Sequence, residues 1–300
     1  MTSEITLFVN PGSGRGRGAG AAGPAARALR DAGFTVRSVV GRDAPDALER
    51  ARAAVAGGTG ALIAVGGDGM VSLALQAVAG RDVPLGIVAA GTGNDIARSC
   101  GLPLGDPGEA GRTIAAALKA GHVRSIDLGR IGDRWFAGVL ASGFDSRVND
   151  RGNRMHWPRG RLRYDAAMLA ELAALRPIGY RIGLDGGPCL ETQATLVAVG
   201  NGPCYGGGMR MCPGARLDDG LFDITVVGPC SRTTLLRVFP KVYRGSHVDH
   251  PAVTVHRAAR VSLEAEDVTG YADGEPVGPL PLTARCVPGA VRLLVTAGDH

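Results

Sequence analysis

The chain contains 300 residues with a formal net charge of +5, and 45% of its residues are hydrophobic while only 4% are aromatic. This balance is typical of a globular protein and excludes a disordered chain. The length exceeds the usual size of a single domain, so we expect two domains, with one large α/β domain as the alternative. The six cysteines form no CxxC pair and no His/Cys ladder, and so indicate neither a zinc site nor a disulfide framework.

In the first 124 residues, short apolar strands alternate with helical patterns. Strands are predicted over 5–10, 34–41, 60–67 and 84–91, and helices over 22–34, 43–58, 71–80 and from 95 onward. Asp46 is predicted to cap the second helix. Such alternation favours an α/β fold with a parallel sheet and crossover helices, in which ligands collect at the carboxyl ends of the strands. We therefore expect the glycine-rich turns after these strands to share one edge of the sheet.

From about Ser125 the pattern changes to short alternating strands, interrupted by one helix over 164–175. Frequent short strands with glycine and proline turns favour a β-rich second domain, and a sandwich is expected over 125–286. The apolar run within 287–300 fits either domain, and its return to the first domain stays open.

The N-terminal stretch MTSEITLFVN lacks the basic segment and the long apolar run of a secretory signal, and no segment reaches membrane-spanning length. We therefore expect a cytoplasmic protein. Arginine supplies nearly all of the positive charge and clusters between Arg147 and Arg163. A basic cluster can serve nucleic acid, anionic lipid headgroups or nucleotide phosphates, and charge alone does not choose among them.

The stretch NPGSGRGRG follows the first strand. Its glycines leave backbone N–H groups unshielded at a helix entrance, which suits phosphate binding, and Arg15 and Arg17 add charge. A simple tight turn is the alternative. A dinucleotide-binding loop is not favoured, because the second strand ends in Gly41 and Arg42 instead of an acidic residue.

Two further glycine turns each contain an aspartate: Asp68 in AVGGDGM and Asp95 in AAGTGND. A carboxylate about 4 Å from a phosphate is repelled by roughly 4 kcal/mol at an effective dielectric near 20, unless a cation or a hydroxyl lies between them. The two acids therefore imply a bound Mg²⁺ ion or a ribose. Helix capping is the alternative; it suits Asp95 but leaves the three glycines of GGDG unexplained.

Seven motifs occur in a fixed order: VNPGSGRG, GGDG, GTGNDIAR, SGFDSRV, RLRYDAAML, NGPCYGGGMRMCPGARLDDGLFD and YADGEPV. Together they resemble the diacylglycerol kinase catalytic family of soluble lipid kinases, which includes sphingosine and ceramide kinases. The resemblance extends over nearly the whole chain, and the combination is far more specific than any single motif.

The resemblance implies an N-terminal nucleotide-binding domain of the phosphofructokinase and NAD kinase type over 1–124, followed by a C-terminal β-sandwich. It further implies an ATP- and Mg²⁺-dependent kinase that transfers the γ-phosphate to a hydroxyl of a lipid such as diacylglycerol. Three alternatives stay open: a kinase of a small non-lipid alcohol, a non-catalytic nucleotide- or lipid-binding regulator, and, least favoured, a dehydrogenase. Nucleic acid is not expected as a partner, and a homodimer stays open.

Residue roles follow from the same resemblance. Asp273 of YADGEPV is implied as the general base and Glu275 as its companion near the metal, although a plain DG hairpin turn is the alternative for this motif. The implied nucleotide and phosphate contacts are Asn10, Gly12, Ser13, Gly14, Gly66, Gly67, Asp68, Gly69, Gly91, Thr92, Gly93, Asn94 and Asp95.

The chain departs from the family pattern at Met70 and Leu73, where a Thr and a Glu are usual. Of the structural Mg²⁺ site found in bacterial members, Asp219 and the carbonyl of Leu221 remain, while Arg216 replaces the other aspartate. A guanidinium cannot ligate a cation, but it can replace the charge of the ion by pairing with an adjacent acid, Asp218 or Asp219.

Arginines and Trp157 in the stretch 147–163 suit peripheral contact with an anionic membrane surface, here the inner one. A solvated arginine-rich loop is the alternative.

Overall fold

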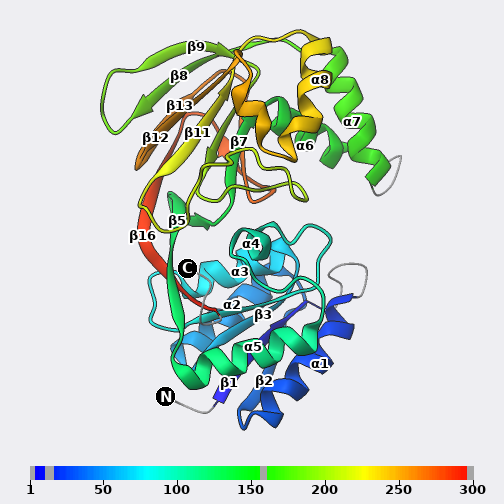
Figure 1. Ribbon diagram of the computed structural model, residues 1–300, viewed down its shortest axis with the longest axis vertical. Helices are drawn as coiled ribbons and strands as arrows, with labels where there is room; N and C mark the ends of the chain where they lie inside the picture. The colour runs from blue at the N-terminus through cyan, green and yellow to red at the C-terminus, as the bar shows by residue number, and fades with distance from the viewer. Residues whose placement is uncertain (1–3, 11–16, 156–160, 296–300) are drawn as a thin grey trace. The chain divides into compact units, whose positions relative to one another are not determined.

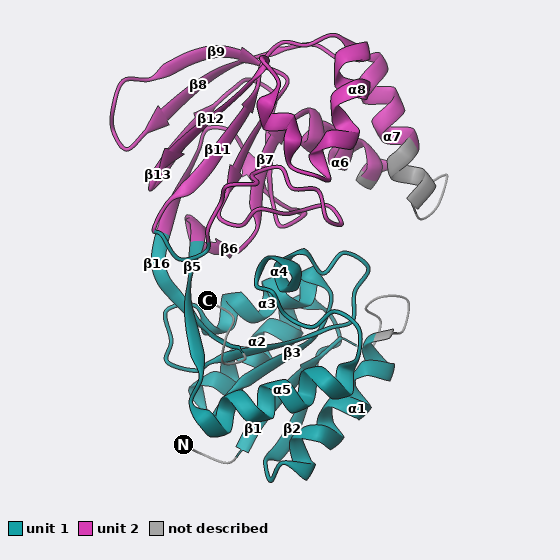
Figure 2. Cartoon of the chain, in the orientation of Figure 1, with its two compact units in different colours: residues 1–128, 217–219, 287–300 teal, residues 129–216, 220–286 magenta. Residues whose placement is uncertain are grey.

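The computed structural model describes residues 4–10, 17–155 and 161–295 (Figure 1). The chain forms two compact units (Figure 2). Unit 1 comprises Met1–Leu128, Leu217–Asp219 and Val287–His300, and unit 2 comprises Gly129–Arg216 and Gly220–Cys286. The domain boundary expected after residue 124 falls inside strand β5 (Val123–Ile131), and the units divide at Leu128.

Unit 1 is built on a parallel sheet whose strands are paired in the order β2-β1-β3-β4. Their bounds are β1 Glu4–Val9, β2 Thr35–Val40, β3 Leu62–Gly66 and β4 Leu85–Ala89. Every residue of β3 and β4 is buried, as expected for central strands covered on both faces. The last strand, β16 (Leu282–Leu294), pairs in parallel with β4 at Leu293 and so continues this sheet.

Helices cover both faces of this sheet, as the alternation of its side chains requires. Ile5, Leu7 and Ile63 point to one face and form a core with α1 (Arg17–Asp31) and α5 (Pro107–Ala120). On the other side, α2 (Ala44–Ala56) packs against α3 (Asp68–Val78) and contacts β2. The short helix α4 (Asp95–Ser99) follows β4. This is the predicted α/β arrangement.

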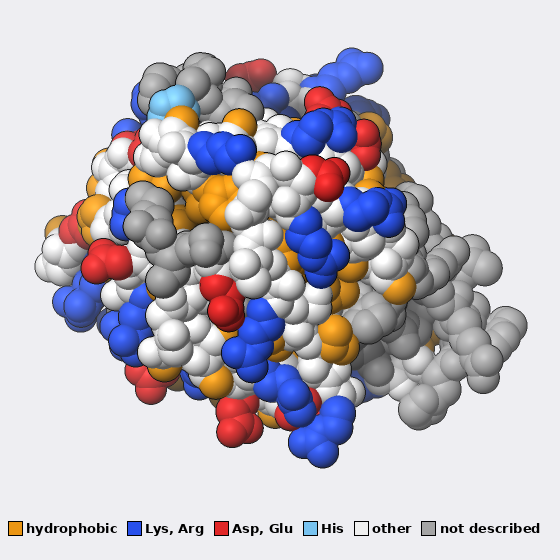
Figure 3. Space-filling model, turned by 90° about the horizontal axis from the view of Figure 1, so that it is seen from below, with side chains coloured by type: hydrophobic (Ala, Val, Ile, Leu, Met, Phe, Trp, Pro, Cys, Tyr) orange, Lys and Arg blue, Asp and Glu red, His pale blue; other side chains and the backbone are white. Residues whose placement is uncertain are grey.

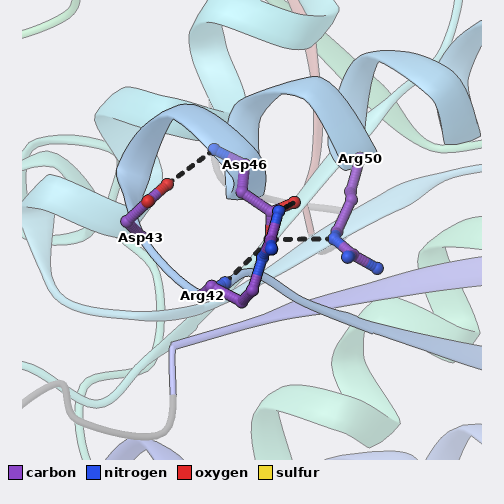
Figure 4. Close-up of polar contacts among 4 residues, drawn as sticks. All are labelled: Arg42, Asp43, Asp46 and Arg50. Atoms are coloured by element: carbon purple, nitrogen blue, oxygen red, sulfur yellow. Dashed lines mark hydrogen bonds and ion pairs between the residues drawn. The ribbon is translucent and has the colours of Figure 1, made fainter.

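The N-cap of α2 is Asp43, whose carboxylate accepts a hydrogen bond from the Asp46 N–H at 2.9 Å (Figure 4). The prediction that Asp46 caps this helix is therefore wrong by three positions. Pro45 explains the difference, because proline is favoured in the first helical turn and the helix thus begins before it. Asp46 instead accepts hydrogen bonds from the Arg42 N–H and from both neighbouring guanidinium groups, which lower its pKa.

Unit 2 contains two sheets. One is antiparallel in the order β12-β11-β10-β7-β14-β15. The other continues the sheet of unit 1 through β16, with the strands paired in the order β16-β13-β8-β9. The bounds are β7 Val139–Gly143, β8 Ile178–Leu184, β9 Leu190–Ala194, β10 Leu196–Gly200, β11 Phe222–Val227, β12 Val253–Ala258, β13 Arg260–Glu264, β14 Thr269–Ala272 and β15 Glu275–Pro279.

Side chains from both sheets meet in one buried cluster of unit 2. Ile182 and Val261 come from one sheet, and Val197 and Ile224 from the other. Sheets that bury facing side chains in this way form a sandwich. The fold class expected from the sequence, a parallel α/β domain followed by a β-sandwich, is confirmed.

Within the described residues, the remaining elements of unit 2 are one short strand and four helical segments. They are β6 Arg134–Phe136, α6 Phe144–Arg154, α7 Arg161–Ala173, α8 Arg232–Val242 and the 3₁₀ turn η2 Ser246–Asp249. No helix within the described residues combines the length and the apolar character needed to cross a membrane.

Candidate active site

The two acidic glycine turns lie in direct backbone contact. They follow β3 and β4, which are neighbouring parallel strands, so both turns emerge at the same edge of the sheet. A Cβ placed on Gly91 would lie 2.4 Å from the Cα of Gly67, closer than real Cβ atoms approach. Glycine is therefore required at Gly91. A Cβ on Gly67 would lie 3.0 Å from the Cα of Gly91, so the same contact also disfavours a side chain at this glycine of GGDG.

Asp68 connects the two turns through its side chain. Its Oδ1 atom accepts a hydrogen bond from the N–H of Ile96 at 3.1 Å, and N–H groups of Asn94 and Asp95 also contribute. Burial raises the pKa of Asp68, and the nearby charge of Asp95 acts in the same direction, whereas these N–H donors oppose the shift. The carboxylate thus caps the first turn of α4 from another segment of the chain.

The residue that caps α4 is Asp68, not Asp95. Capping by Asp95 is the alternative that the sequence favours, but the side chain that accepts a hydrogen bond from the start of α4 is that of Asp68. Asp95 is the first residue of that helix and is only 7% exposed. Capping therefore accounts for part of the role of Asp68.

Asn94 shapes the second turn from within. Its φ of 55° lies in the left-handed region, which asparagine tolerates better than most residues. Its side chain accepts the Gly91 N–H at 2.8 Å and donates to the Gly91 carbonyl at 3.2 Å. The turn is consequently closed on itself before α4 begins.

The start of α3 is open to an anion. Gly67 is the N-cap of this helix, and no side chain caps it. The first N–H groups of a helix carry partial positive charge and lack partners within the helix. Gly69, in the first turn, is exposed, and a Cβ there would meet nothing within 4 Å. Packing among the described residues thus gives no reason for glycine at this position.

The structure shows fewer contacts for the other predicted nucleotide residues. Asn10 is exposed at the end of β1, and its N–H donates to the Val65 carbonyl at 3.5 Å. Gly12, Ser13 and Gly14 lie outside the described residues. The carbonyl of Gly93 accepts a long hydrogen bond of 3.4 Å from Arg98.

A hollow of about 500 Å³ lies elsewhere in unit 1. Residues of β1, β2 and α2 line it, among them Thr6, Arg37 and Arg50. None of the predicted nucleotide residues does, so this hollow is separate from the two acidic turns.

In unit 2, Asp273 occupies a two-residue hairpin turn between β14 and β15. Asp273 and Gly274 both have positive φ, 50° and 83°, as a type I′ turn requires. The carboxylate accepts hydrogen bonds from the N–H groups of Ala137 and Gly138 at 2.9 and 2.8 Å. The backbone of Asp273 and Gly274 therefore forms the hairpin turn that was the alternative for this motif. In addition, the two N–H donors fix the orientation of the Asp273 carboxylate. Glu275 begins β15 and is exposed.

Asn201 supports the segment of Ala137 and Gly138, whose N–H groups bind the Asp273 carboxylate. Its fully buried side chain donates to the Ala137 carbonyl at 2.9 Å, and its N–H donates to the Gly138 carbonyl at the same distance. The sequence contained one signal for this residue: it begins the NGPCYGGG motif directly after a strand. The resemblance includes this motif but implies no role for Asn201.

A second group that the sequence left unassigned is the pair Asp145 and Tyr205. Burial raises the pKa of Asp145 to about 6, against a hydrogen bond from the Tyr205 hydroxyl that lowers it. The pKa of Tyr205 is raised as well, first by burial and then by the neighbouring carboxylate. Asp145 lies in the motif SGFDSRV, which was part of the resemblance.

The predicted pairing of Arg216 with Asp218 or Asp219 stays a prediction, and all three residues make polar contacts in the structure. Asp218 forms an ion pair of 2.7 Å with Arg124 on β5. Across the described part of the chain, no three His, Cys, Asp or Glu side chains gather into a metal-binding group. The predicted magnesium site at Asp219 and Leu221 involves one carboxylate and one carbonyl, and it stays a prediction.

Comparisons with known proteins cover both units. The family model "Diacylglycerol kinase catalytic domain" matches residues 4–131, and "YegS C-terminal NAD kinase beta sandwich-like domain" matches residues 138–295. A "Diacylglycerol kinase" of Mycobacterium tuberculosis (strain ATCC 25618 / H37Rv) is 47% identical over 97% of this chain and 94% of its own. A "Diacylglycerol kinase" of Bacillus subtilis (strain 168) is 27% identical over 92% of this chain and 90% of its own.

Solved structures share the fold. A diacylglycerol kinase from Bacillus anthracis str. Sterne superposes with a TM-score of 0.74 at 22% identity, over 99% of this chain and 98% of the other. An NAD kinase from Archaeoglobus fulgidus in complex with ATP has a TM-score of 0.58 at 12% identity, over 100% of this chain and 95% of the other. The two family models and the extended sequence identity lead to one conclusion: this chain belongs to the diacylglycerol kinase catalytic domain family.

Proposed function

We propose that this protein is an ATP-dependent lipid kinase that transfers the γ-phosphate to a hydroxyl of a lipid such as diacylglycerol. The observation that carries the proposal is the 47% identity to the Mycobacterium tuberculosis diacylglycerol kinase over 97% of this chain. That match includes the two acidic turns and the Asp273 hairpin, whose geometry suits phosphoryl transfer.

In this proposal, the nucleotide phosphates approach the glycine turns of unit 1. The uncapped start of α3 and the open space above Gly69 favour an anion, because N–H groups there can reach phosphate oxygens. The same part of the fold would use the predicted contacts from Asn10 to Gly14 and from Gly91 to Asp95.

Magnesium fits the acids of these turns. Asp68 and Asp95 supply hard carboxylate oxygens, which Mg²⁺ prefers together with phosphate oxygens. The raised pKa of Asp68 has the charge of Asp95 among its causes, and a divalent cation beside the pair would relieve that repulsion. When bound, the ion would neutralise charge on the transferred phosphoryl group.

Asp273 is proposed as the residue that orients the acceptor hydroxyl and takes its proton, with Glu275 as its companion. Phosphoryl transfer passes through a loose transition state, so a carboxylate near the hydroxyl acts mainly by positioning. The two N–H donors from Ala137 and Gly138 fix the carboxylate in one orientation, which is the property that this role needs.

The proposal is tested with γ-labelled ATP and a panel of lipid and soluble alcohols. Native protein is expected to label a lipid, and Asp273→Asn is expected to lower kcat at least 100-fold, the usual size of a general-base contribution. Asn201→Ala, which leaves the carboxylate in place but removes part of its support, is expected to lower kcat about tenfold without changing KM for ATP.

The alternatives give other outcomes in this assay. Label in a soluble alcohol but in no lipid would favour the kinase of a small metabolite. Normal ATP binding without transfer to any acceptor would favour the non-catalytic regulator, which the departures at Leu73 and Arg216 motivate. An Asp273→Asn variant as active as native protein would contradict the assignment of the base.

A further inference from the structure

Helix α8 of unit 2 presents apolar side chains to solvent. Five large hydrophobic residues are exposed in the described part of the chain: two of them, Leu169 and Leu236, lie on α7 and α8, and a third, Tyr243, is the C-cap of α8. Leu236 is 56% exposed and Tyr243 is 46% exposed. Together with exposed Pro240 they occupy positions i, i+4 and i+7, which share one face of a helix. We call these three residues the α8 stripe.

The opposite side of α8 packs into unit 2, so the stripe is a true outer face. Val242 is buried in a cluster with Met211 and Leu196, and Phe239 packs partly against the same cluster. The ring of Phe239 also meets that of Tyr243 edge to face, with centroids 6.2 Å apart. Packing of Val242 and Phe239 in this cluster thus fixes the orientation of the α8 stripe.

Basic residues flank the α8 stripe on both sides. At 100° per residue, Arg232 lies on one side of Leu236, and Arg237, Lys241 and Arg244 lie on the other. No Asp or Glu occurs between Ser231 and Gly245. Within the described residues, Arg237, Lys241 and Arg244 form no ion pair. The face drawn in Figure 3, by contrast, carries Lys and Arg interspersed with Asp and Glu.

The neighbouring helix is fixed to this surface. The guanidinium group of Arg232 donates a hydrogen bond to the carbonyl of Ala173, the last residue of α7. Leu169, one turn earlier on α7, is 62% exposed. Figure 1 shows α7 and α8 in the same part of unit 2.

We infer that the α8 stripe and its basic flanks form a docking surface for an anionic phospholipid bilayer. An apolar face bordered by Lys and Arg and free of acids is the pattern of helices that lie in a membrane interface. A second copy of the chain fits less well, because pairing this face with itself would bring like charges together. The inference rests on the proposed function, since a kinase of membrane lipids must reach a bilayer.

This surface differs from the one expected over 147–163. There, Arg151 is already engaged with Glu171 at 2.5 Å, and part of the segment lies outside the described residues. Arg232 is engaged with the Ala173 carbonyl, whereas Arg237, Lys241 and Arg244 have no acidic neighbours between Ser231 and Gly245 and remain available to lipid phosphates.

The test is co-sedimentation of the full chain with vesicles, without ATP or diacylglycerol. Native protein is expected to bind vesicles of phosphatidylglycerol and phosphatidylcholine, and to bind pure phosphatidylcholine much less. Arg237→Glu is expected to weaken binding to the anionic vesicles about 30-fold, since each charge near an anionic leaflet is worth about fivefold. Leu236→Ser is expected to weaken it about tenfold.

Matched controls lie in the same unit. Val255→Ser changes a residue of β12 that is 45% exposed, and Arg285→Glu makes the same charge reversal at an exposed site on β16. Both controls are expected to bind as native protein does. All four variants are expected to phosphorylate a dispersed short-chain diacylglycerol at the native rate, because that substrate needs no bilayer.

Native-like vesicle binding by Leu236→Ser and Arg237→Glu would overturn the docking surface while leaving the kinase proposal intact. So would a native dimer that Leu236→Ser converts to monomer without loss of vesicle binding. Vesicle binding that depends on α8, in a protein that phosphorylates no alcohol, would support the docking surface and refute the kinase function. These outcomes therefore distinguish a failure of the docking surface from a failure of the kinase proposal.

Discussion

Single side chains at this site combine structural and chemical tasks. Asp68 caps α4 with one carboxylate oxygen, yet it also stands beside Asp95 at an uncapped helix start. An acid near phosphates requires a cation, and Asp68 can ligate one while it also makes the capping bond to Ile96. The two readings are compatible, because a carboxylate has a second oxygen available.

Asp145 provides a prediction at the same scale. Its pKa is raised from 3.8 to about 6 in the folded protein, so the folded state binds this proton more tightly than the unfolded chain. The stabilising effect of the proton is complete below about pH 4 and is lost as pH rises through about 6. Asp145→Asn, which stays neutral, is therefore expected to be up to about 3 kcal/mol more stable than native protein at pH 8 and nearly equal to it at pH 4.

Denaturant unfolding of both proteins across this pH range measures the difference. Asp133→Asn, at an exposed turn of the same unit, serves as the control for the substitution itself. A constant difference between native protein and Asp145→Asn from pH 4 to 8 would contradict the assignment of the raised pKa.

At the scale of elements, the central feature is the contact between the turns after β3 and β4. The strand and helix pattern and the glycines near both turns were readable from the sequence, because they reflect local preferences. The crossing of Gly67 and Gly91 was not, since it depends on which strands are neighbours. The same limit applies to Asn201, whose partner Ala137 lies 64 residues away.

The two glycines are expected to respond differently to substitution by alanine. Gly91→Ala forces its Cβ against the Gly67 backbone and is expected to destabilise the protein by about 1–3 kcal/mol. Gly69→Ala meets open space within a helix and is expected to leave Tm unchanged or higher. If the proposed nucleotide site is right, Gly69→Ala nevertheless weakens ATP binding.

Thermal unfolding and ATP titration of both variants separate these effects. Native ATP affinity in Gly69→Ala would argue against phosphates approaching α3 at this position. Native stability in Gly91→Ala would show that the turns can move apart, contrary to the close contact described above.

The two units of the whole molecule are not two consecutive pieces of chain. Unit 1 takes in Leu217–Asp219 and Val287–His300 besides its first 128 residues. The hydrogen bond from the Asp127 N–H to the Leu217 carbonyl, 2.6 Å long, joins two of these segments. The fold class is predictable from the sequence, which leaves the return of the last strand open, but no local pattern assigns Leu217–Asp219 to unit 1.

Removal of the last strand tests how much unit 1 depends on it. A chain ending at Cys286 lacks the part of β16 that pairs with β4, and so leaves the wholly buried strand β4 as an open edge. Such an edge invites pairing between molecules. We expect the truncated chain to aggregate in sedimentation velocity experiments in which the full chain does not. A monomeric truncated chain with native ATP affinity would contradict this dependence.

The pairing of β4 with β16 also bears on how the protein is made. About 200 residues separate Leu85 from its partner Leu293, and β16 is the last strand among the described residues. At roughly 5–20 residues per second, a ribosome needs on the order of 10–40 s to add them. During that interval the edge of β4 that pairs with β16 is open, so we expect the sheet to be completed only after β16 has been synthesised. A chaperone that shields apolar strands would matter most before that point.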